Sequence, residues 1–276
     1  MMPQTPHIAF IGAGNMAQAI LKGMLAAGYP QDKICASGRT QAKLDILSAD
    51  SGIQTSTDNL ALCHQADVIV LGVKPHMMGD LVQSIAPAVD ASKQLIVSVA
   101  AGILASSIET WLGQKAPIVR CMPNTPSLVG QGAAGLFATD DVSDVQKQTA
   151  STIMQSVGLA LWVEREAHID AVTAVSGSGP AYYFLMMEAM IAGAEQLGLS
   201  NEVAQQLVLQ TALGAAQMAQ QSDQTPAQLR VAVTSPKGTT EQALNTFNDG
   251  GFSQLCSQAM AAAHHRSQEL AQLFKA

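Results

Sequence analysis

The sequence predicts an α/β protein in which a doubly wound sheet domain is followed by an all-α domain. Up to about Val163, short apolar runs alternate with helical patterns, as expected when strands and helices alternate around a parallel sheet. From Ala171 onward no strand pattern appears, and helical signals continue to the end of the chain. We therefore expect one domain over residues 1–165 and a second over residues 166–276.

The first predicted strand ends in a glycine-rich turn that opens a helix. Gly12, Gly14 and Ala17 form a G-x-G-x-x-A pattern directly after an apolar run. Gly12 permits the tight turn, Gly14 lets the backbone approach a pyrophosphate, and Ala17 allows close packing of the helix on the strand. Unpaired N–H groups at the helix N-terminus attract an anion. An ordinary strand-to-helix turn is the alternative, but the context favours a Rossmann dinucleotide site at Gly12, Gly14, Asn15, Met16 and Ala17.

The second predicted strand indicates which dinucleotide is bound. In an NAD site, an Asp or Glu near the end of this strand accepts hydrogen bonds from the ribose 2′-OH. No acid stands there; Ser37, Arg39 and Thr40 offer hydroxyls and a guanidinium, which suit a 2′-phosphate. We expect NADPH as the cofactor, with NADH use also open. The alternative for Arg39 is an ordinary solvated arginine after a strand.

Two further strands are expected to border the cofactor. The apolar run over residues 66–73 ends at Lys74 and Pro75, and the run over residues 94–99 ends in the small residues Ala100–Gly102. The carboxyl ends of parallel strands face the ligand crevice in such sheets. Both segments should therefore lie along the dinucleotide.

A sixth predicted strand, residues 117–122, runs into the sequence Pro123-Asn124-Thr125-Pro126. Two prolines in four residues stiffen the loop. A stiff loop could hold Asn124 and Thr125 in fixed positions near the crevice.

The second half is unusually poor in charge. Between Ala171 and Ser222 the charged residues are Glu188, Glu195 and Glu202. Helices that are apolar on most faces must be buried, and about a hundred residues cannot easily bury them alone. In the whole chain 13% of residues are charged, against about 25% in typical proteins. We therefore expect these helices to intertwine with those of a second subunit. Two glycine-rich loops, residues 176–180 and 235–240, should interrupt them.

Composition excludes several classes of partner and site. A net charge of −7 argues against nucleic acid or an anionic membrane as the main partner. The cysteines have no short spacing that suggests a metal site, so no metal is expected. No basic, apolar leader begins the chain, and its most apolar later stretch, residues 181–197, is broken by two glutamates. We expect a cytoplasmic protein that acts on a small molecule.

The usual acid of a nicotinamide enzyme is hard to find here. The helical half has only Lys237 and Lys275 as lysines, and the histidines stand without a partner motif. Hydroxyls and backbone N–H groups remain at Ser235–Thr240, a loop that opens a helix. Such a loop can hold a carboxylate and hydrogen-bond a nearby nitrogen or oxygen.

Six motifs together resemble the pyrroline-5-carboxylate reductase family in order and spacing, and they span essentially the whole chain. They are Gly12–Ala17, Val73–Pro75, Val99–Gly102, Met122–Pro126, Val175–Tyr182 and Thr234–Thr240. The resemblance implies that NAD(P)H reduces the cyclic imine of 1-pyrroline-5-carboxylate to L-proline, the last step of proline synthesis. It also implies a homodimer with interlocked helical domains, and leaves open a larger decamer of dimers.

The resemblance also implies roles for individual residues. The glycine turn would hold the pyrophosphate, and Ser37, Arg39 and Thr40 the adenosine phosphate. Further cofactor contacts would come from Asn59, Val73, Lys74, Pro75, Ala100, Ala101 and Gly102.

On the substrate side, the resemblance implies a carboxylate cradle at Ser235, Gly238, Thr239 and Thr240, with the Thr240 hydroxyl beside the imine nitrogen as the catalytic group. Glu166 resembles a substrate-side acid of some members. One position departs from the family pattern, because Lys237 stands where glycine usually precedes Gly238. A cation there could alter substrate affinity.

Two other functions are weighed against this one. A β-hydroxyacid dehydrogenase shares the layout but needs a helical lysine, which the chain lacks in place. A non-catalytic NADP(H) sensor would have no need of the loops at residues 176–180 and 235–240. By contrast, a protonated cyclic imine is already electrophilic, so its reduction requires placement more than a strong acid.

Overall fold

The computed structural model describes residues 2–276, which divide into two compact units. The first unit runs up to Ser178 and takes in Ala262–Ala276 as well, and the second comprises Gly179–Ala261. The chain thus leaves the first unit once and returns to it. The two units are described separately below.

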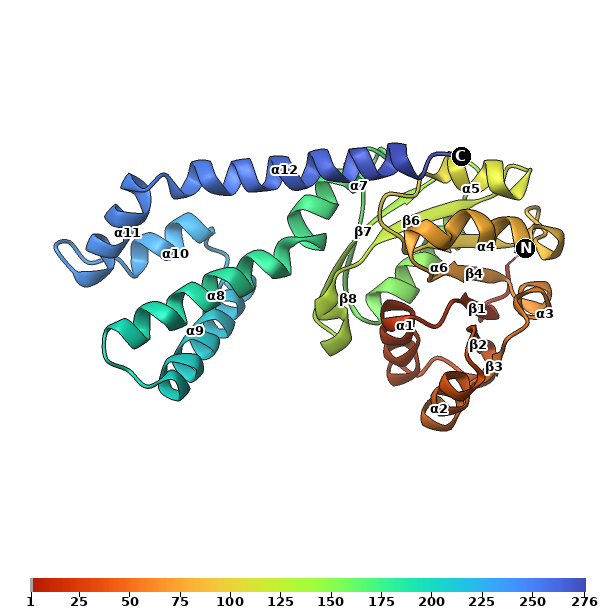
Figure 1. The fold of residues 1–276 in the computed structure, drawn as a ribbon, viewed down its shortest axis with the longest axis horizontal. Coiled ribbons are helices and arrows are strands. Elements are labelled where there is room, and N and C mark those ends of the chain that lie inside the picture. Colours follow the sequence, from red (N-terminus) through yellow and green to blue (C-terminus); the bar gives the residue numbers. More distant parts are fainter. Residues whose placement is uncertain (1) are drawn as a thin grey trace. The chain divides into compact units, whose positions relative to one another are not determined.

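An eight-stranded sheet forms the centre of the first unit, with strand order β3-β2-β1-β4-β5-β6-β7-β8 (Figure 1). The strands are β1 (Ile8–Ile11), β2 (Ile34–Ser37), β3 (Gln54–Ser56), β4 (Val68–Leu71), β5 (Leu95–Ser98), β6 (Ile118–Met122), β7 (Gly132–Ala138) and β8 (Gly158–Trp162). β1 lies between β2 and β4, and all pairs from β3 to β6 are parallel. The strand order reverses direction at β1, which creates a switch point at the carboxyl edge.

The expectation of an entirely parallel sheet is wrong at β7. This strand pairs antiparallel with β6, with Val119 opposite Ala138 and Met122 opposite Gly135. A parallel pair needs a crossover of about a dozen residues or more, usually a helix. Between these strands the chain has only a short loop with a 3₁₀ turn at Thr125–Val129, so it reverses. β8 then pairs parallel with β7 after an intervening helix.

Helices cover both faces of the sheet. They are α1 (Asn15–Ala26), α2 (Gln41–Ser51), α3 (Asn59–Gln65), α4 (Met78–Ile85), α5 (Ala105–Leu112) and α6 (Asp144–Gln155), followed by the short α7 (His168–Val172). Alternate β1 residues enter two separate cores. Phe10 packs with Ile20 of α1 and Ile153 of α6, whereas Ile11 lies in the core of α3, α4 and α5. Burial on both faces explains why the central strands read as continuous apolar runs.

The expected loop at residues 176–180 is not a loop. Residues Thr173–Gly177 form a π-helical turn that continues α7 into α8 (Gly179–Gln196). The Ser178 amide donates to the Thr173 carbonyl at 2.8 Å, and the Ser176 hydroxyl donates to the Val172 carbonyl at 3.1 Å. The serines and glycines therefore fit within a widened helix because their polar groups are satisfied along its axis.

The second unit is helical, as expected. After α8 come α9 (Asn201–Gln221), α10 (Pro226–Ala232), α11 (Thr239–Asp249) and the first part of α12 (Phe252–Leu273), whose end belongs to the first unit. Among the described residues of this unit, Ala204 and Val208 are the only buried apolar side chains, while Tyr183 and Phe184 stay more than 60% exposed. These helices need a further apolar surface to cover them.

Candidate functional site

The candidate cofactor residues lie at one edge of the sheet. β1 to β6 are parallel, so the segments that follow them meet at their shared carboxyl edge. Five of these segments carry the residues expected from the sequence: Gly12–Ala17, Ser37–Thr40, Asn59, Val73–Pro75 and Ala100–Gly102. The structure therefore gathers them around the switch point at β1, where ligands bind in open α/β sheets.

The glycine turn after β1 touches the turn after β4. Gly12 has a φ of 97°, and a Cβ added to it would lie 2.5 Å from Val73 Cγ1. A Cβ at Gly72 would lie 2.6 Å from the Gly12 carbonyl oxygen and 2.9 Å from the Ala17 Cβ. Neither glycine can therefore carry a side chain without displacing its neighbours. The missing side chains keep the backbone of both turns accessible at close range.

The N-terminus of α1 is open to an anion. Gly14 is the N-cap residue and supplies no side-chain cap, and both Gly14 and Asn15 are exposed. The first N–H groups of a helix have no partner within the helix. They also carry its partial positive charge, so this turn is suited to hold a pyrophosphate.

Ser37 stabilises the glycine turn by accepting two hydrogen bonds from its backbone. Its side chain is fully buried, the Gly12 amide donates to its hydroxyl at 3.3 Å, and the Ala13 amide donates to its carbonyl at 2.7 Å. Arg39 and Thr40 differ, because both are exposed at the start of α2. The accessible charge and hydroxyl at the end of β2 therefore come from Arg39 and Thr40.

The loop after β5 is closed in by the C-terminal helix. Ala100 and Gly102 are buried, and Gly102 has a φ of 71°. A Cβ added to Gly102 would lie 3.1 Å from the Cβ of Leu270 in α12. This contact could not be predicted, because it joins residues far apart in the chain that share no local pattern.

Glu166, the expected substrate-side acid, is engaged inside the first unit. Its Oε1 atom lies 2.8 Å from Arg120 Nη1 and accepts a 2.7 Å hydrogen bond from the Ala105 amide. The Arg120 side chain is 4% exposed. Sequence reasoning missed this pair, although Arg120 is the one charged residue in an otherwise apolar predicted strand. A buried guanidinium requires a carboxylate partner, which was the available signal.

Asn124, expected near the crevice, is held in place by two hydrogen bonds. It is buried, its Nδ2 donates to the Ser176 carbonyl at 3.0 Å, and its Oδ1 accepts from the Ala133 amide at 2.9 Å. Asn124 therefore braces the π-helical turn against the start of β7. Thr125, next to it, is exposed.

The loop at residues 235–240 lies in the second unit, at the start of α11. Gly238 is the N-cap residue without a side-chain cap, and a Cβ on it would lie 2.9 Å from the Ser235 carbonyl oxygen. Ser235 and Thr239 are exposed, and Thr240 is half-buried. Hydroxyls and helix N-terminal amides thus share one turn, an arrangement that binds a carboxylate.

Three cysteines are unsuited to nucleophilic chemistry. Burial raises the pKa of the Cys35 thiol to about 11 and that of Cys63 to about 12, and burial also raises the pKa of Cys121. Thiols with such pKa values stay protonated near neutral pH, and the thiolate is the reactive form. Across residues 2–276 no cluster of three His, Cys, Asp or Glu side chains is arranged to hold a metal ion.

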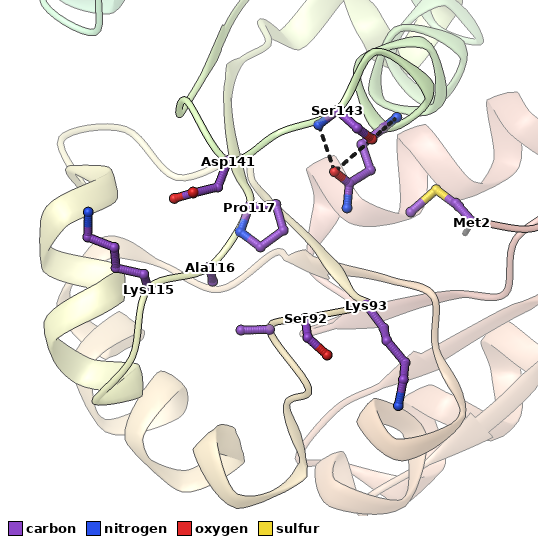
Figure 2. Close-up of a pocket in the computed structure, with 10 residues that line it drawn as sticks. Met2, Ser92, Lys93, Lys115, Ala116, Pro117, Asp141 and Ser143 are labelled. Atoms are coloured by element: carbon purple, nitrogen blue, oxygen red, sulfur yellow. Dashed lines mark hydrogen bonds between the residues drawn. The ribbon is translucent and has the colours of Figure 1, made fainter.

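A pocket lies at the amino edge of β5 and β6, away from the candidate cofactor residues at the carboxyl edge. Figure 2 shows it between the segments that precede β5 and β6 and the one that follows β7, with Lys93, Lys115 and Asp141 at its walls. Lys93 donates to Asp90 at 2.6 Å, and Ser143 belongs to the capping box of α6. None of the candidate cofactor or substrate residues lines it.

Comparison with known proteins decides the family. A family model described as NADP oxidoreductase, coenzyme F420-dependent, matches residues 7–102, and one described as pyrroline-5-carboxylate reductase dimerisation matches residues 166–270. A pyrroline-5-carboxylate reductase of Pseudomonas aeruginosa is 53% identical over 97% of this chain and 98% of its own length. The chain belongs to the pyrroline-5-carboxylate reductase family.

Solved structures agree with this assignment. A pyrroline-5-carboxylate reductase from Coxiella burnetii matches with a TM-score of 0.94 and 46% identity, covering 97% of this chain and 99% of that one. The Plasmodium falciparum pyrroline carboxylate reductase, solved with NADP bound, matches with a TM-score of 0.85 and 30% identity, covering 98% and 100%. With the dimerisation region of the pyrroline-5-carboxylate reductase family present, the chain is an oligomer. Within the described part of the chain, no helix has both the length and the hydropathy to cross a bilayer.

Proposed function

We propose that this chain is a pyrroline-5-carboxylate reductase that uses NADPH to reduce the cyclic imine of 1-pyrroline-5-carboxylate to L-proline in the cytoplasm. The observation that most strongly supports this function is the 53% identity to a pyrroline-5-carboxylate reductase over nearly the whole length of both chains. Both the glycine turn and the loop before α11 are present with the geometry described above. Neither nucleic acid nor membrane is needed as a partner, and NADH remains an alternative hydride donor.

The residues at the carboxyl edge fit a dinucleotide. Gly12, Gly14 and the first turn of α1, with Asn15, Met16 and Ala17, would hold the pyrophosphate. Arg39 and Thr40, which are exposed, would bind the 2′-phosphate, while the buried Ser37 supports the glycine turn. Asn59, Val73, Lys74, Pro75, Ala100, Ala101 and Gly102 would line the rest of the site. When bound, NADPH supplies the hydride.

The loop before α11 would hold the substrate. The substrate carboxylate would bind the N-terminal amides of α11 and the hydroxyls of Ser235 and Thr239, where Gly238 keeps the backbone accessible. Thr240 would place its hydroxyl beside the ring nitrogen. The imine carbon accepts the hydride, the C=N electron pair moves to nitrogen, and nitrogen keeps its proton in the product amine. Thr240 orients this nitrogen for the transfer.

The contacts of Glu166 with Arg120 and Ala105 favour a role other than direct contact with the substrate. One carboxylate oxygen already serves both the buried Arg120 and the Ala105 amide. Its role is taken up below.

The second half of the chain would supply substrate binding and assembly. We assign dinucleotide binding to the first unit and substrate binding and dimerisation to the second. Residues 166–178 and Ala262–Ala276, expected in the second domain, then belong with the dinucleotide-binding half. The exposed apolar side chains of the second unit support a homodimer with interlocked helical domains. Such dimers could associate further into a decamer.

Absorbance at the NADPH band tests the function directly. The purified chain is mixed with NADPH and pyrroline-5-carboxylate, and in parallel with NADP⁺ and a series of 3-hydroxyacids. We expect NADPH consumption with the imine and no reduction of NADP⁺ with the hydroxyacids. Turnover of a hydroxyacid alone would indicate a β-hydroxyacid dehydrogenase. NADPH binding without any turnover would indicate a cofactor sensor.

A further inference from the structure

A charged side chain is buried in the middle of the sheet. Arg120 lies in β6 between Ser98 of β5 and Phe137 of β7, and its side chain is 4% exposed. Burying a guanidinium is costly unless a counter-charge and hydrogen bonds compensate for the lost water. Glu166 supplies that charge at 2.8 Å.

The same carboxylate oxygen caps a helix. The Ala105 amide, at the first residue of α5, donates to Glu166 Oε1 at 2.7 Å. The N-cap residue of α5 is Leu104, which provides no side-chain cap. Glu166, which is 61 residues away in sequence, therefore takes the place of a local capping residue and sets a negative charge at the helix N-terminus.

These contacts link the two ends of the loop after β5 to each other. Ser98, the last residue of β5, is paired with Arg120 in the sheet. Arg120 holds Glu166, and Glu166 holds Ala105, the first residue of α5. The segment between Ser98 and Ala105 contains Ala100–Gly102, so the sheet fixes one end of this loop and the ion pair ties the other end to the same sheet. Leu270 of α12 also packs against Gly102 in this loop.

We propose that Glu166 is a positioning residue for the dinucleotide: held by Arg120, it fixes the start of α5 and thereby the shape of the Ala100–Gly102 loop that contacts the cofactor. The inference rests on the proposed function, in which that loop lines the NADPH site. It assigns to Glu166 an effect on cofactor affinity through the backbone, without contact between its side chain and either reactant.

Glu166→Gln tests the proposal, because it preserves size and one acceptor but removes the charge. We expect the KM and the dissociation constant for NADPH to rise about tenfold, with kcat and the KM for the imine changed less than about twofold. In the protein without cofactor, amide hydrogen exchange in the peptide over residues 99–108 should accelerate. Exchange of the glycine turn over residues 10–16 should stay unchanged.

Ser143→Ala is the matched control, because it also removes a side-chain cap from a helix of the first unit. The Ser143 hydroxyl accepts a 3.4 Å hydrogen bond from the Gln146 amide in the capping box of α6, and neither residue belongs to the candidate cofactor or substrate set. We expect this variant to lower the melting temperature and to leave NADPH affinity unchanged. Should Glu166→Gln fail to fold, Glu166→Asp keeps the charge and shortens the side chain by one methylene, and the same measurements apply.

Three outcomes would overturn the inference. One is an unchanged NADPH dissociation constant in a folded Glu166→Gln variant. Another is an equal loss of affinity in Ser143→Ala, which would make the effect one of general stability. The third is a rise in the imine KM alone, which would restore Glu166 as a substrate-side acid. Failure of the proposed function itself would differ, because the unaltered protein would then bind no NADPH.

Discussion

The Lys237 amide donates a 2.8 Å hydrogen bond to the carboxylate of Glu241, although Lys237 has a φ of 60°. Lys237 is the one residue other than glycine with positive φ in the described chain. The left-handed conformation costs a residue with a Cβ about 1–2 kcal/mol, so the position favours glycine. A glycine at this position, as the resemblance implies, would avoid this cost.

Lys237→Gly should stabilise the protein slightly. Relief of the left-handed strain outweighs the extra freedom of glycine in the unfolded chain, so we expect a gain of about 0.5–1 kcal/mol. The melting temperature at fixed protein concentration measures it. Pro236→Gly is the control, because Pro236 has no positive φ, and it should destabilise. A lower melting temperature for Lys237→Gly would contradict the prediction.

Gly12→Ala should abolish most NADPH binding. The added Cβ would lie 2.5 Å from Val73 Cγ1 and push apart the two turns at the switch point. Gly28→Ala is a matched control, since Gly28 also has positive φ but has open space around its Cβ position. We expect Gly12→Ala to raise the NADPH dissociation constant at least about tenfold, and Gly28→Ala to cost about 1 kcal/mol of stability alone. Equal NADPH affinities in the two folded variants would refute the assignment.

Arg39→Ala should change the choice between the two cofactors. An exposed guanidinium at the end of β2 can bind the 2′-phosphate, and a hydrogen bond to a charged group is worth about 1.5–3 kcal/mol. We expect the kcat/KM for NADPH to fall about tenfold or more, with little change for NADH. Lys43→Ala, which removes an exposed charge from α2, is the control. An unchanged ratio between the cofactors would argue against this role of Arg39.

Thr240→Ala should lower turnover and spare cofactor binding. A hydroxyl that orients the ring nitrogen contributes about tenfold or more to kcat. Thr240→Ser should restore most of the rate, because it keeps the hydroxyl. Thr246→Ala on the same helix is the control, since its hydroxyl donates to the Gln242 carbonyl. Parallel loss of turnover and NADPH affinity in Thr240→Ala would indicate a structural role instead.

Local patterns were sufficient to predict much of this molecule. β4 was visible as a continuous apolar run because both faces of the strand are buried. Thr225 followed by Pro226 is typical of a helix start, and α10 begins there in the structure, which adds a capping box between Thr225 and Gln228. The strand, turn and helix around Gly12 follow from the special backbone conformation that the turn requires.

The features that were not predicted depend on contacts between distant residues. The antiparallel direction of β7 follows from the short loop before it, which cannot hold the crossover that a parallel pair needs. The Arg120–Glu166 pair spans 46 residues, and neither residue has a local pattern that names its partner. The π-helical turn at Thr173–Gly177 uses serines and glycines that, by themselves, predict a loop.

The return of Ala262–Ala276 to the first unit makes the second unit an insertion rather than a C-terminal appendage. Leu270 packs against Gly102, and Ser267 is bonded to Asp170, so the last turns of α12 complete the nucleotide-binding half. An exchange of the helical half between relatives must therefore be spliced at two junctions. A chain cut after Ala261 would lose part of its dinucleotide domain along with its tail.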